Sequence, residues 1–125
     1  MLLTTLRAGQ ANAMPVSWHL MMESIPPLLV SVVSNGNCSF ATLKTTKECV
    51  INIPNVELTK TVVACGNTLG SNLDKFEKFG LTPVAAKLVK SPFVAECYAS
   101  LECKVVDMKL AVRLWDRSAP TMNRE

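Results

Sequence analysis

Apolar residues occur along this chain in short runs that are typical of β-strands. Residues 2–6 are apolar and tolerate an extended backbone, and residues 28–33 form a continuous apolar run typical of a buried strand. Residues 49–53 are rich in β-branched side chains, and residues 101–105 alternate between apolar and polar, as a half-buried antiparallel strand does. Further extended segments are expected at residues 11–18, 84–89 and 93–98. Beyond Val105 the apolar positions change parity, which indicates a β-bulge.

Turn-forming residues separate these segments. Residues 7–10 are expected to turn, and the sequence Asn35-Gly36 tolerates the positive φ angles that tight turns require. Pro15 has no N–H for a β-ladder, so we expect residues 11–18 at a sheet edge or a bulge.

Capping residues indicate two or three short helices. The first is expected within residues 39–48, with Asn37 or Ser39 as its N-cap. A second is expected from Asn55 to about residue 65, with Gly66 as a left-handed stop. A third is expected over residues 73–79, before Gly80.

Five or six short strands with interleaved short helices predict a mainly β fold, a small β-barrel with short inserted helices. A doubly wound parallel sheet is disfavoured because helices of 10–15 residues do not follow the strands in repeated order. A length of 125 residues allows at most one domain. Residues 117–125 are polar and aperiodic, so they are expected to form a frayed tail.

Composition narrows the class of protein. The chain is 49% hydrophobic and 18% charged, which is a globular profile. The net charge of +3 is small and spread along the chain, so a nucleic-acid partner is not expected. No apolar run is long enough to span a membrane, and the N-terminus lacks the basic start of a signal peptide, so the expected location is the cytoplasm.

The cysteines do not form a metal-binding pattern. They occupy positions 38, 49, 65, 97 and 103, without a C-x-x-C motif, and His19 is the single histidine. Cys49 and Cys103 lie within apolar alternation, which favours small buried core residues in a reducing compartment. A catalytic thiol would need a nearby base, and His19 is the one histidine that could serve.

The turn into the first helix is a candidate anion site. A helix N-terminus presents backbone N–H groups and a partial positive charge, and the Asn37 side chain and Ser39 hydroxyl could add donors. The alternative is that Ser39 only caps its own helix.

Two further positions are candidate ligand contacts. Lys75 could give a charge-assisted hydrogen bond to a phosphate or ring oxygen, although a solvated helix face is the alternative. Trp18 could stack on an aromatic cofactor, with Asn12 and Ser17 donating to its polar edge. The alternative for Trp18 is a core or interface residue.

A series of short segments occurs in a distinctive order along the chain. The series begins with Asn12-Ala13-Met14-Pro15-Val16-Ser17-Trp18-His19, Ile25-Pro26-Pro27-Leu28-Leu29, Cys38-Ser39-Phe40 and Glu48-Cys49-Val50-Ile51-Asn52-Ile53-Pro54. It continues with Cys65-Gly66-Asn67, Asp74-Lys75-Phe76, Gly80-Leu81-Thr82-Pro83, Ala95-Glu96-Cys97-Tyr98 and Leu101-Glu102-Cys103. In this order the segments resemble the flavin reductase-like family, the flavoredoxin type most of all. The likeness covers roughly residues 2–108 and implies a flavin reductase-like domain at residues 1–108.

The resemblance implies an FMN-binding split β-barrel, usually a homodimer with the flavin near the subunit interface. It implies hydride or electron transfer through FMN, with NAD(P)H or a protein as electron donor. By this likeness Asn12 and Trp18 would contact the isoalloxazine and ribityl region. Ser39 would bind the phosphate and Lys75 the flavin, which joins the candidate contacts into one pocket.

The chain departs from the family pattern after about Met108, where family members continue with further strands. They also carry a later histidine and phenylalanine that meet the flavin, whereas no histidine follows His19 here. The resemblance therefore predicts an incomplete split barrel with a divergent tail at residues 109–125. The alternative function is a non-catalytic remnant or interaction domain that binds flavin weakly or not at all.

Overall fold

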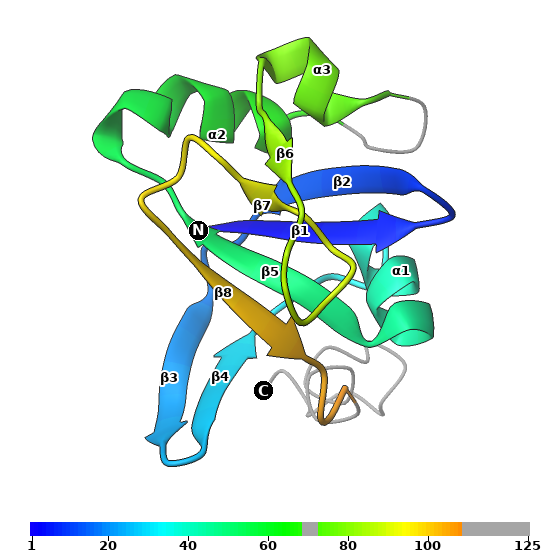
Figure 1. The fold of residues 1–125 in the computed structure, drawn as a ribbon, viewed down its shortest axis with the longest axis vertical. Helices are drawn as coiled ribbons and strands as arrows, with labels where there is room; N and C mark the ends of the chain where they lie inside the picture. The colour runs from blue at the N-terminus through cyan, green and yellow to red at the C-terminus, as the bar shows by residue number, and fades with distance from the viewer. Residues whose placement is uncertain (69–72, 109–125) are drawn as a thin grey trace, which may run out of the picture.

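The computed structural model describes residues 1–68 and 73–108, and the fold of this part is mainly β (Figure 1). A four-stranded antiparallel sheet has the order β2-β1-β5-β8. Its strands are β1 (Leu2–Arg7), β2 (Gln10–Pro15), β5 (Glu48–Ile53) and β8 (Ala99–Lys104). Two smaller antiparallel pairs are β3 (His19–Ser24) with β4 (Pro27–Ser31), and β6 (Pro83–Val84) with β7 (Phe93–Val94). The prediction of a mainly β fold with short inserted helices is confirmed.

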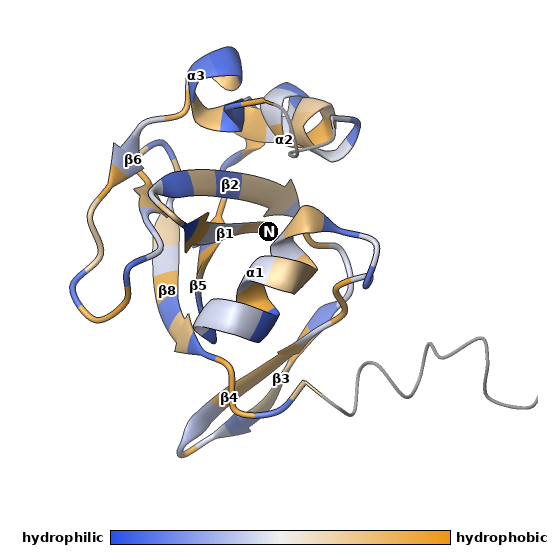
Figure 2. Ribbon diagram, turned by 90° about the vertical axis from the view of Figure 1, so that its right-hand side faces the viewer, coloured by the Kyte–Doolittle hydropathy of each residue, from blue (hydrophilic) through white to orange (hydrophobic). Residues whose placement is uncertain are grey.

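Short helices lie on either side of this sheet (Figures 1 and 2). Helix α1 (Cys38–Thr46) packs against β1 and β2. A 3₁₀ turn, η1 (Val56–Leu58), leads into α2 (Thr59–Gly66), and α3 (Lys75–Phe79) follows; α2 and α3 both pack against β2. Strand β2 therefore contacts each of the three α-helices found in the described ranges. None of the helices in the described ranges is long and apolar enough to cross a membrane.

The β1–β2 hairpin sets the register at the edge of the sheet. Ala8 and Gly9 form its two-residue turn with φ angles of 50° and 78°, both positive, as this type of turn requires. The turn places Thr5 directly opposite Asn12. Strand β2 forms the edge of the sheet and ends at Pro15, so the expectation from that proline is confirmed.

Each face of the sheet has its own apolar core. One cluster contains the buried residues Leu2, Ala13, Cys65, Phe76, Leu81 and Val94 and lies on the side of α2 and α3. The other contains Leu3, Met14, Val16, Leu43, Cys49 and Ile51 and lies on the side of α1. Successive residues of a strand point to opposite faces, so Leu2 and Leu3 serve the two cores in turn.

A fully buried amide joins four strands. Asn52, at 0% exposure, donates through Nδ2 to Leu2 O and to Thr4 Oγ1, each at 3.2 Å. Its Oδ1 accepts from the Val94 N–H at 2.9 Å and from the Ser100 hydroxyl at 2.8 Å. Asn52 thus satisfies polar groups of β1, β7 and β8 from its place in β5.

The β3–β4 hairpin differs from the sequence prediction. Strand β3 was not anticipated, and β4 is half-exposed along residues 28–31 rather than buried. The physical reason is that the hairpin projects away from the four-stranded sheet (Figures 1 and 2). Leu29 of β4 still packs against the cluster on the side of α1, but it is only partly buried there. Leu20, Met21 and Met22 are 56%, 59% and 59% exposed.

The predicted strands at residues 84–89 and 93–98 shrink to the two-residue strands β6 and β7. The Glu102 carboxylate accepts from the consecutive backbone N–H groups of Lys87, Leu88 and Val89. Because a side chain satisfies these donors, they need no neighbouring strand. The predicted bulge after Val105 is also wrong, since β8 ends at Lys104.

The glycine and asparagine predictions have mixed outcomes. Gly80 ends α3 with a φ of 65°, as expected, whereas the turn at Asn35-Gly36 needs no positive φ. Asn55 caps η1 by accepting a hydrogen bond from Leu58 N.

Gly66 is the last residue of α2 and is not left-handed. A Cβ there would lie 2.9 Å from Pro15 Cγ, so glycine is required because α2 lies close to β2. The tail predicted at residues 109–125 lies outside the described residues.

Replacing Gly66 with alanine is expected to lower the free energy of unfolding by about 1–2 kcal/mol, because the new methyl group overlaps a stiff proline ring. Helix propensity alone predicts the opposite sign, a gain of about 1 kcal/mol. Urea unfolding followed by circular dichroism measures the change. Adding Pro15→Ala should remove the loss, and Gly36→Ala, whose Cβ would meet no atom closer than 3.9 Å, is the matched control. A stabilised Gly66→Ala protein would contradict the contact.

Candidate functional site

A hydrogen bond between β2 and α1 lies at the centre of the candidate site. Asn12 Nδ2 donates to Ser39 Oγ at 3.0 Å. Ser39 is the second residue of α1 and is fully buried. It does not cap its helix: Asn37 holds the N-cap position, and its side chain makes no capping hydrogen bond. The alternative that Ser39 serves only as a helix cap is therefore wrong.

Two polar atoms beside this bond are buried and lack a partner. They are Asn12 Oδ1 and Thr5 Oγ1, and Thr5 is only 1% exposed. Thr5 and Asn12 are directly opposite in the β1–β2 ladder, so their side chains lie on the same face. Buried polar groups normally find hydrogen-bond partners, so these two atoms mark a place where a ligand could supply them.

Sequence reasoning missed Thr5, although the signal was available. A two-residue turn at Ala8-Gly9 pairs Arg7 with Gln10 and hence Thr5 with Asn12. Once Asn12 was a candidate and the turn was expected at residues 7–10, the register identified its cross-strand neighbour.

Lys75 is buried at the outer edge of β2. Its ammonium donates to Ala13 O at 3.1 Å and to Cys65 O at 2.9 Å, and the residue is 4% exposed. Burial lowers the pKa of Lys75 below its ordinary value of 10.5, while Cys65 and Cys38 act in the opposite direction. The solvated-face alternative is wrong for this residue and holds for its exposed neighbours Glu77 and Lys78.

Ser39 and Lys75 approach the same part of β2. Ser39 is bonded to Asn12, and Lys75 is bonded to the next residue, Ala13. Cys38, adjacent to Ser39 in α1, acts electrostatically on the Lys75 ammonium. Asn12 and Ser39 are thus bonded directly, and Lys75 reaches the backbone of the neighbouring residue Ala13 from α3, so the three residues meet β2 at adjacent positions.

The other three predicted residues lie at the surface. Ser17 and Asn37 are exposed, and their side chains form no hydrogen bond with Asn12, Ser39 or Lys75. The Trp18 side chain is 62% exposed, and its carbonyl accepts from Val32 N at 2.9 Å at the base of the β3–β4 hairpin. A buried core role for Trp18 is therefore wrong, whereas an interface role and a ligand role both remain compatible with its exposure.

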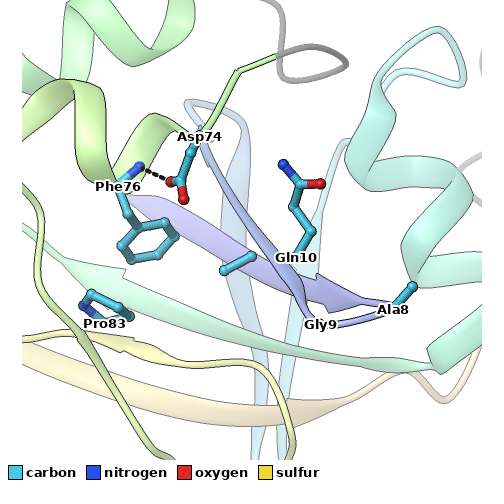
Figure 3. Close-up of a pocket in the computed structure, with 7 residues that line it drawn as sticks. Ala8, Gly9, Gln10, Asp74, Phe76 and Pro83 are labelled. Carbon is cyan, nitrogen blue, oxygen red and sulfur yellow. Dashed lines mark hydrogen bonds between the residues drawn. The ribbon is translucent and has the colours of Figure 1, made fainter.

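A shallow hollow of about 420 Å³ lies between the β1–β2 turn and α3 (Figure 3). It is lined by Ala8, Gly9, Gln10, Ala11, Asp74, Phe76 and Pro83. Asp74 Oδ1 accepts from Phe76 N at 2.9 Å and from Glu77 N at 3.2 Å, and so caps α3. None of the six predicted residues lines this hollow, and the carboxylate at its wall makes it a poor place for a phosphate.

Comparison with known proteins decides the family. The model of the flavin reductase like domain matches residues 1–115. The chain belongs to the flavin reductase-like family. An uncharacterized protein of Archaeoglobus fulgidus is 36% identical over 95 residues, which are 76% of this chain and 54% of that protein.

Solved structures of the family share this fold. Flavoredoxin of Desulfovibrio vulgaris superposes with a TM-score of 0.82 and 27% identity, covering 85% of this chain and 58% of that one. An FMN-binding domain of flavin reductases-like enzyme from Shewanella baltica superposes with a TM-score of 0.84 and 22% identity, covering 92% and 61%. The fold is therefore that of the FMN-binding split barrels, present in part. The chain spans between half and two thirds of the length of these relatives.

Proposed function

We propose that this flavin reductase-like chain binds FMN and passes hydride or electrons through it, with NAD(P)H or a protein as donor. The observation that carries the proposal is the meeting of Asn12, Ser39 and Lys75 at one part of β2. It is supported by structural neighbours whose names describe FMN-binding proteins, among them one from Thermus thermophilus.

The polar groups at the site fit different parts of such a ligand. Asn12 Oδ1 is an unpaired acceptor, so it suits a ribityl hydroxyl or a ring N–H and not a phosphate oxygen. The Ser39 hydroxyl accepts from Asn12, which leaves its hydrogen to donate to a ligand oxygen. The Thr5 hydroxyl can either donate or accept. Together they offer both donors and acceptors, as a sugar-like chain requires.

Lys75 would supply positive charge. An ammonium has three protons, and two of those on Lys75 are used by the carbonyls of Ala13 and Cys65. The third can point toward an anionic or carbonyl oxygen of the ligand. Ser17, Trp18 and Asn37 would contribute from the exposed rim, Trp18 with its indole plane.

Bound FMN would supply the two-electron chemistry. The role of this chain is to bind and orient it, because the grouped residues Asn12, Ser39 and Lys75 include no general acid of ordinary pKa near 7.

Removing these side-chain contacts should weaken FMN binding. Asn12→Ala and Ser39→Ala are each expected to raise the FMN dissociation constant roughly tenfold, about 1.4 kcal/mol, by removing one buried hydrogen-bonding group. Quenching of FMN fluorescence on titration with the 125-residue chain measures the constant. Asn55→Ala, an amide that caps η1 away from the site, is the matched control, and circular dichroism checks folding. A wild-type chain that leaves FMN fluorescence unchanged would overturn the proposal.

We also propose that the chain forms a homodimer through the β3–β4 hairpin. Leu20, Met21, Met22 and Ile25 are 56–88% exposed on this hairpin, an apolar patch of the kind that marks a protein interface. Leu20→Glu is expected to weaken self-association roughly tenfold by placing a charge in the buried contact. Sedimentation equilibrium measures it. Val56→Glu, at an 88% exposed position on η1, should leave the assembly unchanged, and equal effects of the two substitutions would count against the hairpin.

A non-catalytic domain with weak flavin binding is the second candidate. One observation favours it: the hollow between the β1–β2 turn and α3 is lined by none of the six predicted residues. NAD(P)H oxidation in the presence of FMN separates the two functions, since the catalytic function requires turnover and the second does not.

A further inference from the structure

Two cysteines face each other across the ladder between β5 and β8. Cys49 and Cys103 are directly opposite in its register, so both side chains lie on the same face of the sheet. That face carries the apolar cluster beneath α1, to which Cys49 belongs and against which Cys103 packs. The sequence led us to expect two separate core residues; the fold makes them a pair.

The ladder fixes the distance between them. The Val105 N–H donates to Lys47 O at 2.9 Å, which makes Lys47 and Val105 a hydrogen-bonded pair. The antiparallel pattern repeats every two residues, so Cys49 and Cys103 are also a hydrogen-bonded pair, with Cα atoms about 5.5 Å apart. Disulfides join Cα atoms that are about 4.4–6.8 Å apart, so the Cα spacing of this pair allows a bridge. A disulfide also needs Cβ atoms about 3.5–4.5 Å apart, closer than the roughly 5.5 Å of a hydrogen-bonded pair, so the two strands must draw together slightly as the bond forms.

The two thiols have different environments. Cys49 is 5% exposed, whereas Cys103 is only partly buried. The neighbouring Cys49 thiol is the main cause that lowers the pKa of Cys103 to about 7, against the effect of burial, and the same neighbour raises the pKa of Cys49. The Cys103 thiol itself donates to Leu101 O at 3.5 Å. Burial raises the pKa of Cys97 to about 11 and also raises that of Cys65.

Charged residues flank the cysteine pair along both strands. Lys47 approaches from the same side, with Nζ 3.4 Å from Met108 Sδ, and Met108 packs on the same cluster. The flanking residues of the ladder, Glu48, Glu102 and Lys104, alternate to the other face, where Glu48 and Glu102 bond to the backbone at residues 87–90.

We propose that Cys49 and Cys103 are a redox-sensitive pair that a peroxide converts into a cross-strand disulfide. The Cys103 thiolate attacks one oxygen of hydrogen peroxide; the O–O bond breaks, the sulfur is oxidised to a sulfenic acid, and the other oxygen leaves as water after taking up a proton. The Cys49 sulfur then attacks the Cys103 sulfur, the S–S bond forms, and the sulfenic oxygen leaves as a second water. In total two thiols and one peroxide give one disulfide and two waters. Because β5 lies beside β1, the bridge would fix β8 to the sheet that carries the candidate site.

The test uses the wild-type chain, treated with hydrogen peroxide, blocked with iodoacetamide and digested with trypsin without reduction. The expected product joins the peptide of residues 48–60 to that of residues 91–104, and fragmentation places the bond at Cys103 rather than Cys97. Cys97→Ser should keep the linked peptide and Cys103→Ser should abolish it. In urea the ladder is unfolded, so oxidation should give disulfides between several different pairs of the five cysteines. A folded chain that links Cys97 instead, or that carries only sulfinic and sulfonic acids, would overturn the proposal.

Discussion

Replacing Asn52 with alanine is expected to lower the free energy of unfolding by about 3–5 kcal/mol, because at least two buried backbone groups lose their partner at once. Val94 N–H and Leu2 O are bonded to the Asn52 amide, and both belong to residues with at most 2% exposure. An unpaired buried polar group costs about 1–3 kcal/mol, and the lost side-chain volume adds to it. Since small domains are stable by only about 5–15 kcal/mol, this loss should be obvious in urea unfolding.

A milder variant keeps the Asn52 prediction testable if the alanine protein does not fold. Ser100→Ala removes the hydroxyl that donates to Asn52 Oδ1 and leaves the amide in place, so we expect a loss of about 1 kcal/mol. Asn55→Ala, which removes an exposed cap of η1, supplies the comparison for an asparagine outside the core. Equal losses at Asn52 and Asn55 would show that the buried network contributes little.

Much of the fold follows from local signals in the sequence. The turn at residues 7–10, the edge position of Pro15 and the strands at residues 49–53 and 101–105 each depend on residues close in the chain. The first helix was expected within residues 39–48 and is found at Cys38–Thr46, ended by Lys47 in the left-handed conformation. Such features need only turn chemistry, alternation and caps, and these can be read from a few neighbouring residues.

The features that sequence reasoning missed depend on distant partners. Nothing near residues 84–89 signals that the Glu102 carboxylate will take up three of their N–H groups. Likewise, the apolar run at residues 28–33 looks like a core strand. Among the residues that the structure describes, however, β4 pairs with β3 alone, in a hairpin that projects from the sheet. In both places the local pattern correctly predicts an extended, apolar segment, but it does not predict which groups that segment will contact.

The candidate site shows the same division. Asn12, Ser39 and Lys75 were expected to share a ligand because of the family resemblance, and the structure now shows how chain folding groups them. The burial of Lys75 could not be read from its helix, because its acceptors are backbone carbonyls 62 and 10 residues away. Every residue has a backbone carbonyl, so the sequence does not show which carbonyl will accept a hydrogen bond from a distant side chain.

Replacing Lys75 with methionine is therefore expected to affect stability as well as any ligand. The variant keeps the length of the side chain but leaves the carbonyls of Ala13 and Cys65 without their charged donor. Two opposing effects must be weighed: the lost charged hydrogen bonds are worth about 1.5–3 kcal/mol each, and relief from burying an ammonium returns part of this. We expect a net loss of about 2–4 kcal/mol in urea unfolding. Lys78→Met, on the exposed face of the same helix, should change stability by less than about 0.5 kcal/mol.

The pH dependence of this difference tests the burial of Lys75 directly. Burial lowers the pKa of Lys75 in the folded chain below the 10.5 that applies when it is unfolded. Between these two values the unfolded state holds more protons, so the contribution of Lys75 to stability rises with pH. That contribution is complete above 10.5 and declines as the pH falls through the folded pKa. The stability gap between wild type and Lys75→Met should thus widen from pH 7 toward pH 10, whereas the gap for Lys78→Met should stay constant. A gap that narrows over this range would mean that the ammonium is better stabilised in the fold than in water, and that its carbonyl partners outweigh its burial.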